Sequence, residues 1–158
     1  MTAILSACER YRYRLERPAK DDGYGAVAFV MLNPSTADAT RDDPTIRRCV
    51  AYARAWGYER LIVGNAYAWR ATDPKELLTV DDPVGPDNDR HLSQILADAR
   101  LVVCAWGTKI KPDRQAAVLQ LLHDYNCHAR ALKVTKDGFP SHPLYLSAAL
   151  VPTRWTPT

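Results

Sequence analysis

Three long apolar runs constrain the fold of this chain more than any other feature of its sequence. They are AVAFVML (26–32), RLIVGNAYAW (60–69) and RLVVCAW (100–106). Each is rich in β-branched and aromatic residues and lacks the polar alternation of a strand with one face in water. Such runs are typical of strands buried on both faces, as in a parallel sheet that helices cover on both sides.

Helices are predicted between these strands. Apolar residues recur at intervals of three and four over 43–57, 85–99 and 111–126, and DPKELL begins a shorter helix. A fourth apolar run, RALKV (130–134), predicts a further short strand. Strands that alternate with helices predict an α/β fold, and we expect a three-layer α/β/α sandwich around a central, mainly parallel four-stranded sheet.

The composition is that of an ordinary globular chain. With 158 residues, of which 47% are hydrophobic and 25% charged, we expect a single domain over residues 1–158. The stretch RYRYRLER near the N-terminus alternates and predicts an exposed or edge strand. The net charge of +3 permits an anionic partner but is well below that of a strongly basic DNA-binding surface.

Cysteine usage and hydropathy predict where the protein works. The four cysteines lie far apart without a CxxC pair, which predicts a reduced, cytoplasmic protein that binds no metal. No apolar run reaches the about 18 residues of a membrane span, so we expect no membrane partner. No organic cofactor is predicted either.

Polar residues follow each predicted strand. NPSTAD comes after the first strand, Asn65 lies near the end of the second, WGTKIK follows the third and PSHPLYL follows the fourth. Ligand sites of parallel sheets lie beyond the carboxyl ends of the strands, so we expect these four segments to meet at one rim. In the last segment, Pro140 and Pro143 stiffen the loop that carries His142.

The residue types at this rim suit recognition of a planar heterocycle. Two amides, several hydroxyls and an imidazole are present, without a carboxylate triad or a metal-ligand set. The Asn65 carboxamide offers one donor and one acceptor side by side, the pattern that reads the edge of a nucleobase. Taken singly, each segment also has a structural explanation as a helix cap, a turn or a core residue.

The ordered set of segments resembles the uracil-DNA glycosylase superfamily. That superfamily has G-[QI]-[DN]-P after its first strand, an asparagine at the end of the second, W-G after the third and H-P-S-P-L-S-A after the fourth. The corresponding segments here are MLNPS, LIVGNAYAWRA, CAWGTKI and SHPLYLSA. Along almost its whole length the chain also resembles a family of small bacterial and phage proteins defined only as a domain of unknown function.

The glycosylase resemblance implies catalytic roles for three residues. Asn33 would hold the attacking water, as in branches of the superfamily where asparagine replaces aspartate, and Asp38 would help to orient it. His142 would stabilise negative charge on the departing base. These roles suit cleavage of an N-glycosidic bond, which needs fixed donors where the base anion develops.

The resemblance also implies binding roles, without metal or cofactor. Asn65 would read the edge of the base, and the base site would further include Pro34, Ser35 and Tyr145. Contacts to DNA would come from Thr108, Lys109, Ser141 and Leu146, with Leu146 filling the space that a flipped nucleotide leaves. The motif HPSP of the superfamily is HPLY here, and Ser35 replaces an aromatic residue. We therefore expect a modified or damaged base in place of plain uracil.

The sequence thus predicts a nucleobase-recognising protein whose partner is DNA or a nucleotide. The leading hypothesis is a metal-independent N-glycosylase of DNA repair or DNA modification. Two alternatives stay open: a non-catalytic protein that binds a modified base in DNA, and an enzyme that acts on free nucleotides or modifies a base.

Overall fold

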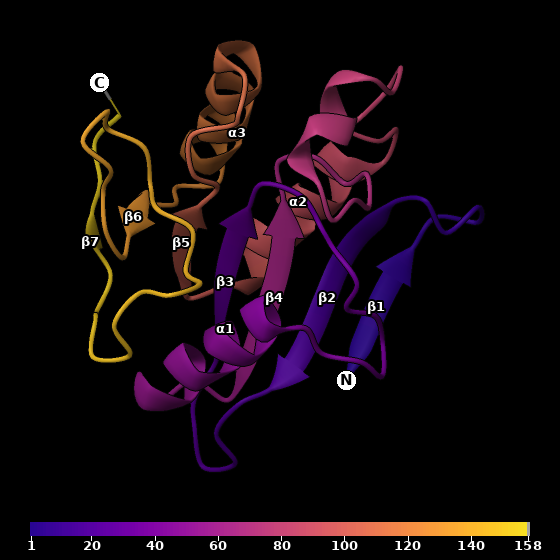
Figure 1. The fold of residues 1–158 in the computed structure, drawn as a ribbon. Helices are drawn as coiled ribbons and strands as arrows, with labels where there is room; N and C mark the ends of the chain where they lie inside the picture. The colour runs from indigo at the N-terminus through magenta and orange to yellow at the C-terminus, as the bar shows by residue number, and fades with distance from the viewer. Residues whose placement is uncertain (158) are drawn as a thin grey trace.

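A mixed sheet forms the centre of the protein in the computed structural model, which describes residues 1–157 (Figure 1). Over these residues the sheet has seven strands: β1 (Thr2–Leu5), β2 (Arg12–Pro18), β3 (Ala26–Met31), β4 (Arg60–Asn65), β5 (Leu101–Ala105), β6 (Arg130–Ala131) and β7 (Thr153–Arg154). Their spatial order is β1-β2-β4-β3-β5-β6-β7. The pairs β4–β3, β3–β5 and β5–β6 are parallel, whereas β1–β2, β2–β4 and β6–β7 are antiparallel.

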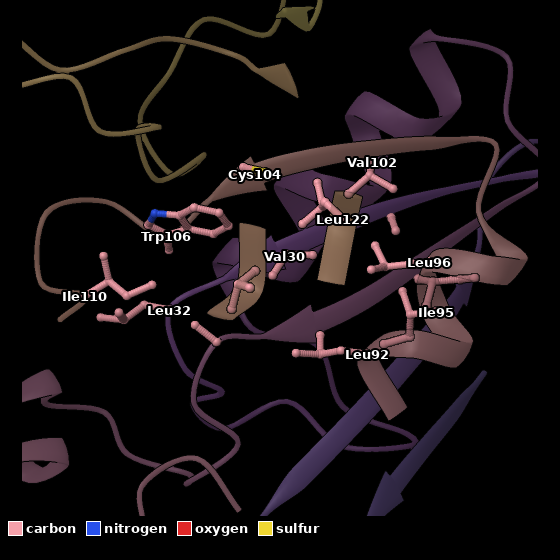
Figure 2. Packing of buried hydrophobic residues seen from close by; sticks show 14 of the residues in the cluster. Val30, Leu32, Leu92, Ile95, Leu96, Val102, Cys104, Trp106, Ile110 and Leu122 are labelled. Atoms are coloured by element: carbon pink, nitrogen blue, oxygen red, sulfur yellow. The ribbon is translucent and has the colours of Figure 1, made fainter. Parts of the chain in front are cut away.

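Helices cover both faces of the sheet. The helices are α1 (Pro44–Ala55), the short 3₁₀ helix η1 (Pro74–Leu78), α2 (Asn88–Asp98) and α3 (Pro112–Asp124). One core cluster joins one face of the sheet to α1, and a second cluster joins the other face to α2 and α3. The second cluster contains Val30 of β3, Leu122 of α3 and Ile95 of α2 (Figure 2). Within residues 1–157, no helix has both the length and the apolar character needed to cross a membrane.

Alternation along β3 explains the two core clusters. Val27 and Phe29 belong to the α1 side, and Ala28 and Val30 belong to the α2 and α3 side. All six residues of β3 are buried, because the strand has a hydrogen-bonded neighbour on each edge and helices over each face. An unbroken apolar run is the sequence that such a position requires.

The predicted helices form within a few residues of their predicted bounds. Asp43 caps α1 by accepting a hydrogen bond from the Ile46 amide at 2.9 Å, and Pro44 occupies the first turn. At the start of α2, the preceding residue Asp87 makes no side-chain cap bond. Asn88 instead lies buried and donates to the backbone carbonyls of Asn65 and Ala66 at 3.0 and 3.2 Å.

The α/β class is confirmed, but the expected four-stranded, mainly parallel sheet needs correction. Over the described residues the sheet has seven strands, and half of the pairings named above are antiparallel. The prediction missed β1 and β7, which are short and carry exposed side chains at alternate or all positions. Their sequences give little periodic signal, because each strand is a sheet edge with few core contacts.

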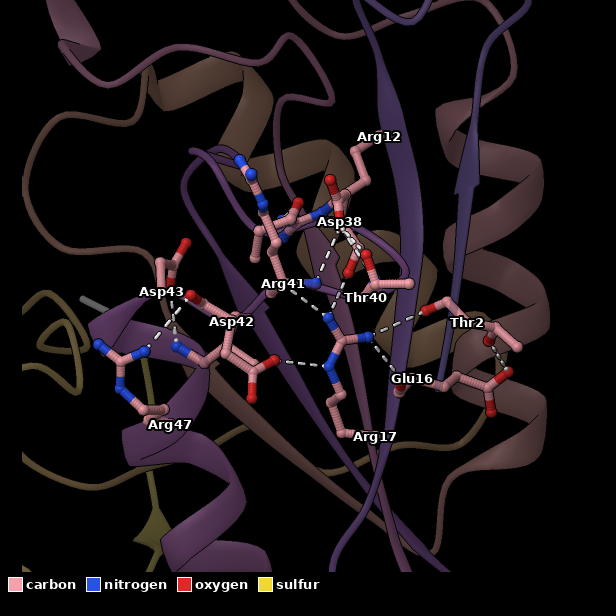
Figure 3. A network of polar contacts seen from close by, with 12 residues as sticks. Thr2, Arg12, Glu16, Arg17, Asp38, Thr40, Arg41, Asp42, Asp43 and Arg47 are labelled. Atoms are coloured by element: carbon pink, nitrogen blue, oxygen red, sulfur yellow. Dashed lines mark hydrogen bonds and ion pairs between the residues drawn. The ribbon is translucent and has the colours of Figure 1, made fainter.

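RYRYRLER, predicted as an exposed or edge strand, forms the buried strand β2 between β1 and β4. Its arginines are buried through pairing with acids and carbonyls. The Arg17 side chain is only 2% exposed, and its Nε contacts Asp42 Oδ1 at 2.6 Å (Figure 3). The two remaining guanidinium nitrogens donate to four backbone carbonyls, those of Thr2, Glu16, Asp38 and Arg41. Arg17 thereby fastens the loop before α1 to the sheet.

Arg17→Ala is expected to lower the free energy of unfolding by about 1–3 kcal/mol, because it leaves several partly buried backbone carbonyls without their donor. Urea denaturation of the two proteins measures the difference. Arg47→Ala is the control, since Arg47 is exposed on α1 and makes a single 3.4 Å contact. Equal losses for the two variants would contradict the role given to Arg17.

Candidate functional site

A cavity of about 430 Å³ lies at the carboxyl ends of β3 and β5. Its walls come from six parts of the chain: β2, the segment after β3, the start of α1, the segment after β4, the segment after β5, and the loop before β7. The lining residues are Arg12, Met31, Leu32, Asn33, Pro34, Ser35, Asp43, Thr45, Ile46, Ala71, Thr72, Pro74, Trp106, Gly107, Thr108, Lys109 and His142. Six of the residues singled out in the sequence are therefore together: Asn33, Pro34, Ser35, Thr108, Lys109 and His142.

Backbone hydrogen bonds between loops hold the walls in place. The Gly107 amide donates to the Pro140 carbonyl at 2.8 Å, which ties the segment after β5 to the loop that carries His142. The Ala71 amide donates to the Pro34 carbonyl at 2.9 Å, which ties the segment after β4 to the segment after β3. Backbone bonds do not depend on side-chain identity, so these ties make the cavity a property of the fold.

The Asn33 side chain has a fixed orientation. Its Nδ2 donates to the Ala71 carbonyl at 2.8 Å and to the Pro34 carbonyl at 3.1 Å. Because the amide nitrogen is engaged with carbonyls, the amide oxygen is the atom left for a ligand or a water molecule. That oxygen is a neutral acceptor, which can orient water but is too weak a base to deprotonate it.

The His142 imidazole is held in one tautomer. The Leu144 backbone N–H donates to Nδ1 at 3.2 Å, so Nδ1 carries a lone pair and the ring proton resides on Nε2. Desolvation in the cavity wall lowers the pKa of His142 below its ordinary value, while the charge of Asp43 acts in the opposite direction. The site thus contains a neutral imidazole with an Nε2–H donor.

Asn65 is not a lining residue, but it lies directly beside the cavity. It is 1% exposed, and it pairs in register with the lining residue Met31. Neighbouring residues in register share a face of the sheet, so the Asn65 side chain stands next to that of Met31 on the α1 side. Neither Nδ2 nor Oδ1 of Asn65 has a hydrogen-bond partner among the described residues. A buried carboxamide without partners is costly, which marks this position as unusual.

Charged groups of the cavity include two that the sequence reasoning missed as site residues, Arg12 and Asp43. Arg12 is 2% exposed, and burial lowers the pKa of its guanidinium to about 10. Asp43 is the single acid among the described lining residues, and Lys109 adds a positive charge at the mouth. The position of Asp43 before Pro44 signals a helix cap, and nothing in that signal points to a cavity.

Asp38, predicted to orient water, lies outside the cavity lining. Its Oδ1 accepts hydrogen bonds from the backbone amides of Thr40 and Arg41, both at 2.9 Å. These bonds lower the pKa of the Asp38 carboxyl. Asp38 borders a neighbouring, more open groove, so within the described residues the acid of the cavity is Asp43.

Three further residues that were predicted for the site, Ser141, Tyr145 and Leu146, lie close to His142 in the sequence but do not line the cavity. Tyr145 is 90% exposed and has a positive φ of 69°, and Leu146 packs against the α1-side core cluster. Ser141 donates its backbone amide to the Lys133 carbonyl at 2.8 Å. The structure therefore separates these three side chains from the group that contains Asn33 and His142.

No group of three or more histidine, cysteine, aspartate or glutamate side chains within residues 1–157 has the geometry to hold a metal ion.

Comparison with known proteins gives a family without an activity. Residues 12–144 match the family model described as "Protein of unknown function (DUF1643)". No curated protein and no solved structure matches the chain. The resemblance to uracil-DNA glycosylases consequently rests on the four motifs and stays a prediction.

The His142 tautomer can be tested by nuclear magnetic resonance. We expect long-range ¹H–¹⁵N correlations to show a protonated Nε2 and a bare Nδ1, with a titration midpoint below the ordinary histidine pKa. Because the fold favours the neutral ring, His142 stabilises the folded protein fully at pH values above its unfolded-state pKa. This stabilisation is lost as the pH falls through the lower folded-state pKa. A His142→Gln variant assigns the signals. A midpoint above the ordinary value is incompatible with this description.

Asn33→Asp is expected to destabilise the protein, because a carboxylate would face the Ala71 and Pro34 carbonyls where Nδ2 now donates. A protonated acid can still donate one hydrogen bond, so the folded-state pKa of the new carboxyl is expected to be raised. The loss of melting temperature relative to wild type should therefore be larger at pH 7 than at pH 4. A pH-independent loss would show that the amide orientation is different.

Proposed function

The chain belongs to the DUF1643 family, and from the chemistry of its cavity we propose that it is a metal-independent N-glycosylase that acts on a modified or damaged base in DNA. The observation that carries the proposal is the joint presence, in one cavity, of the neutral His142 with its Nε2–H donor and of Asn33 with a fixed amide. The Nε2–H of His142 suits a departing base anion, and the amide oxygen of Asn33 suits an attacking water molecule.

The volume and the walls of the cavity support a nucleobase as the ligand. Its volume of about 430 Å³ lies in the range of about 300–1,000 Å³ of small-molecule sites. Pro34 and Trp106 contribute flat apolar surface to the walls. Beside them, the partnerless Asn65 carboxamide offers the donor and acceptor pair that a base edge needs. In this proposal the neighbouring lining residue Met31 shifts, so that a bound base reaches the buried amide and satisfies it.

The proposed reaction is hydrolysis. Water oriented by the Asn33 oxygen adds to C1′ of the sugar as the bond from C1′ to the base nitrogen breaks, and the base leaves with the bonding electrons. The Nε2–H of His142 donates to a carbonyl oxygen of the base as negative charge develops there. Asp43 accepts the proton of the attacking water, and the negative charge of its carboxylate also stabilises the positive charge that develops on the sugar. The departing base then takes a proton from solvent.

The finer fold assignment belongs to the same proposal. The four strands β4, β3, β5 and β6 are consecutive in the sheet and mutually parallel. In the proposed correspondence they form the glycosylase-like part of the fold, and the four motifs follow these strands in the order that the resemblance requires. The antiparallel strands are additions at either side.

A second candidate function is the binding or conversion of a free nucleotide. The observation that favours it is the charge of the cavity, where Arg12 and Lys109 outnumber Asp43. A duplex-binding surface needs basic residues along a wide face, whereas a free nucleotide needs them only inside the pocket.

Oligonucleotides that contain uracil, hydroxymethyluracil or mismatched bases test the hydrolysis. Treatment with alkali after incubation is expected to cleave the strand at abasic sites formed by the wild-type protein. His142→Ala should lower the rate by about a hundredfold or more, because it removes the donor to the base anion. Asp43→Asn should lower the rate as well, while asparagine keeps the cap of α1 and hence the fold.

His123→Ala is the matched control, since His123 lies exposed on α3 and does not line the cavity. It is expected to retain the wild-type rate. No cleavage with any base would remove the hydrolytic proposal. Binding of a modified base without cleavage would instead support the non-catalytic reader.

A further inference from the structure

Four arginines of the sheet and helices are buried, and they differ in one respect. Three have a carboxylate partner: Arg14 contacts Asp98 at 2.8 Å, Arg17 contacts Asp42 at 2.6 Å and Arg114 contacts Asp89 at 2.7 Å. Arg12 forms no ion pair with any acid of residues 1–157. The fold therefore supplies an ion-pair partner to each buried guanidinium except the one that lines the cavity.

The hydrogen bonds of Arg12 are incomplete as well. Its Nη1 donates to the Ala37 carbonyl at 2.9 Å, which holds the guanidinium in place. Its Nε is fully buried and has no acceptor among the described residues. Arg17, on the same strand, has an acceptor for every guanidinium nitrogen. The Nη1 of Arg12 is thus fixed by a backbone carbonyl, whereas its Nε makes no hydrogen bond with the described residues.

An unpaired buried cation is costly, so its retention needs a reason. Desolvation of a charged group costs several kcal/mol, and replacement by an apolar residue is often neutral or stabilising. Asp43 offsets part of this cost by its charge, but it forms no ion pair with Arg12. A ligand that brings a negative group to the cavity would complete both the charge and the hydrogen bonds of the site.

We propose that Arg12 is the anion-binding residue of the cavity and that the ligand places a phosphate group against its unused guanidinium edge. One further feature of the same cavity agrees with a phosphate. Lys109, which is exposed, adds a second positive charge to the lining.

This inference deepens the proposed function and rests on it for the nucleoside part of the ligand. The phosphate subsite itself depends on Arg12 and the cavity. The phosphate could belong to a free mononucleotide, as a monoester, or to a DNA strand, as a diester. The recognition chemistry is shared, and the two sources differ in charge and in the size of what is attached.

Calorimetric titration with five probes separates these cases: inorganic phosphate, deoxyuridine, deoxyuridine 5′-monophosphate, the dinucleotide dUpdU, and chloride at matched ionic strength. We expect the monophosphate or the dinucleotide to bind at least about tenfold more tightly than deoxyuridine, as a charge-assisted hydrogen bond to a fixed guanidinium provides. The tighter of the two identifies the source of the phosphate. Chloride is expected to have no effect.

Arg12→Met should abolish the preference for the phosphorylated probe. It should change the melting temperature of the unliganded protein only slightly, because removal of a buried, unpaired cation offsets the loss of the donor to the Ala37 carbonyl. Arg47→Met, the same change at an exposed arginine outside the cavity, should leave the preference intact. If Arg12→Met does not fold, Arg12→Lys keeps the charge and removes the planar fork, and it should weaken phosphate binding by about tenfold.

Equal affinity for deoxyuridine and its phosphorylated forms, or a preference that survives in Arg12→Met, would overturn the inference and leave the nucleobase proposal standing. Arg12-dependent binding of inorganic phosphate without any binding of deoxyuridine would support the inference and show that plain uracil is not the base. Failure of all phosphate-bearing probes to bind would overturn it as well.

Discussion

The burial of β3 on both faces is the constraint on which the rest of the structure depends. β3 has parallel neighbours on both edges and helices above and below, so polar side chains are excluded along its whole length. Its carboxyl end, where Met31 gives way to Asn33, is where this central strand first carries polar groups. The parallel strand β5 ends beside the end of β3, and the segment after β5 is hydrogen-bonded to the loop that carries His142. The cavity follows from this arrangement.

Much of the fold could be predicted because its signals are local. Unbroken apolar runs define β3, β4 and β5, and helical periodicity with a proline in the first turn defines α1 and α3. The edge strands could not be predicted in this way, because their order comes from pairing with a neighbour rather than from their own side chains. In the candidate site, the residues next to strand ends could be predicted as well, because the strands that they follow have local signals.

Arg12 and the surroundings of Asn65 depend on distant parts of the chain. In the sequence, Arg12 belongs to a stretch whose alternating arginines have the pattern of a solvent-facing strand, and its burial arises because β1 adds to the edge of the sheet and the loop with Ala37 covers it. The sequence places Asn65 near the end of an apolar strand and predicts its amide as a recognition group. That its amide has no partner follows only from the packing around it. Charge inside a cavity is therefore a tertiary property, whereas an amide at a strand end is a local one.

The hydrogen bond from the Leu144 amide to His142 has a consequence for sequence drift. A main-chain group selects the tautomer of the imidazole, where many enzymes use an aspartate or another side chain for that purpose. Nineteen of the twenty amino acids carry such an amide, and proline does not. Position 144 can thereby change its side chain over evolutionary time, as long as the turn persists, while the proton stays on Nε2.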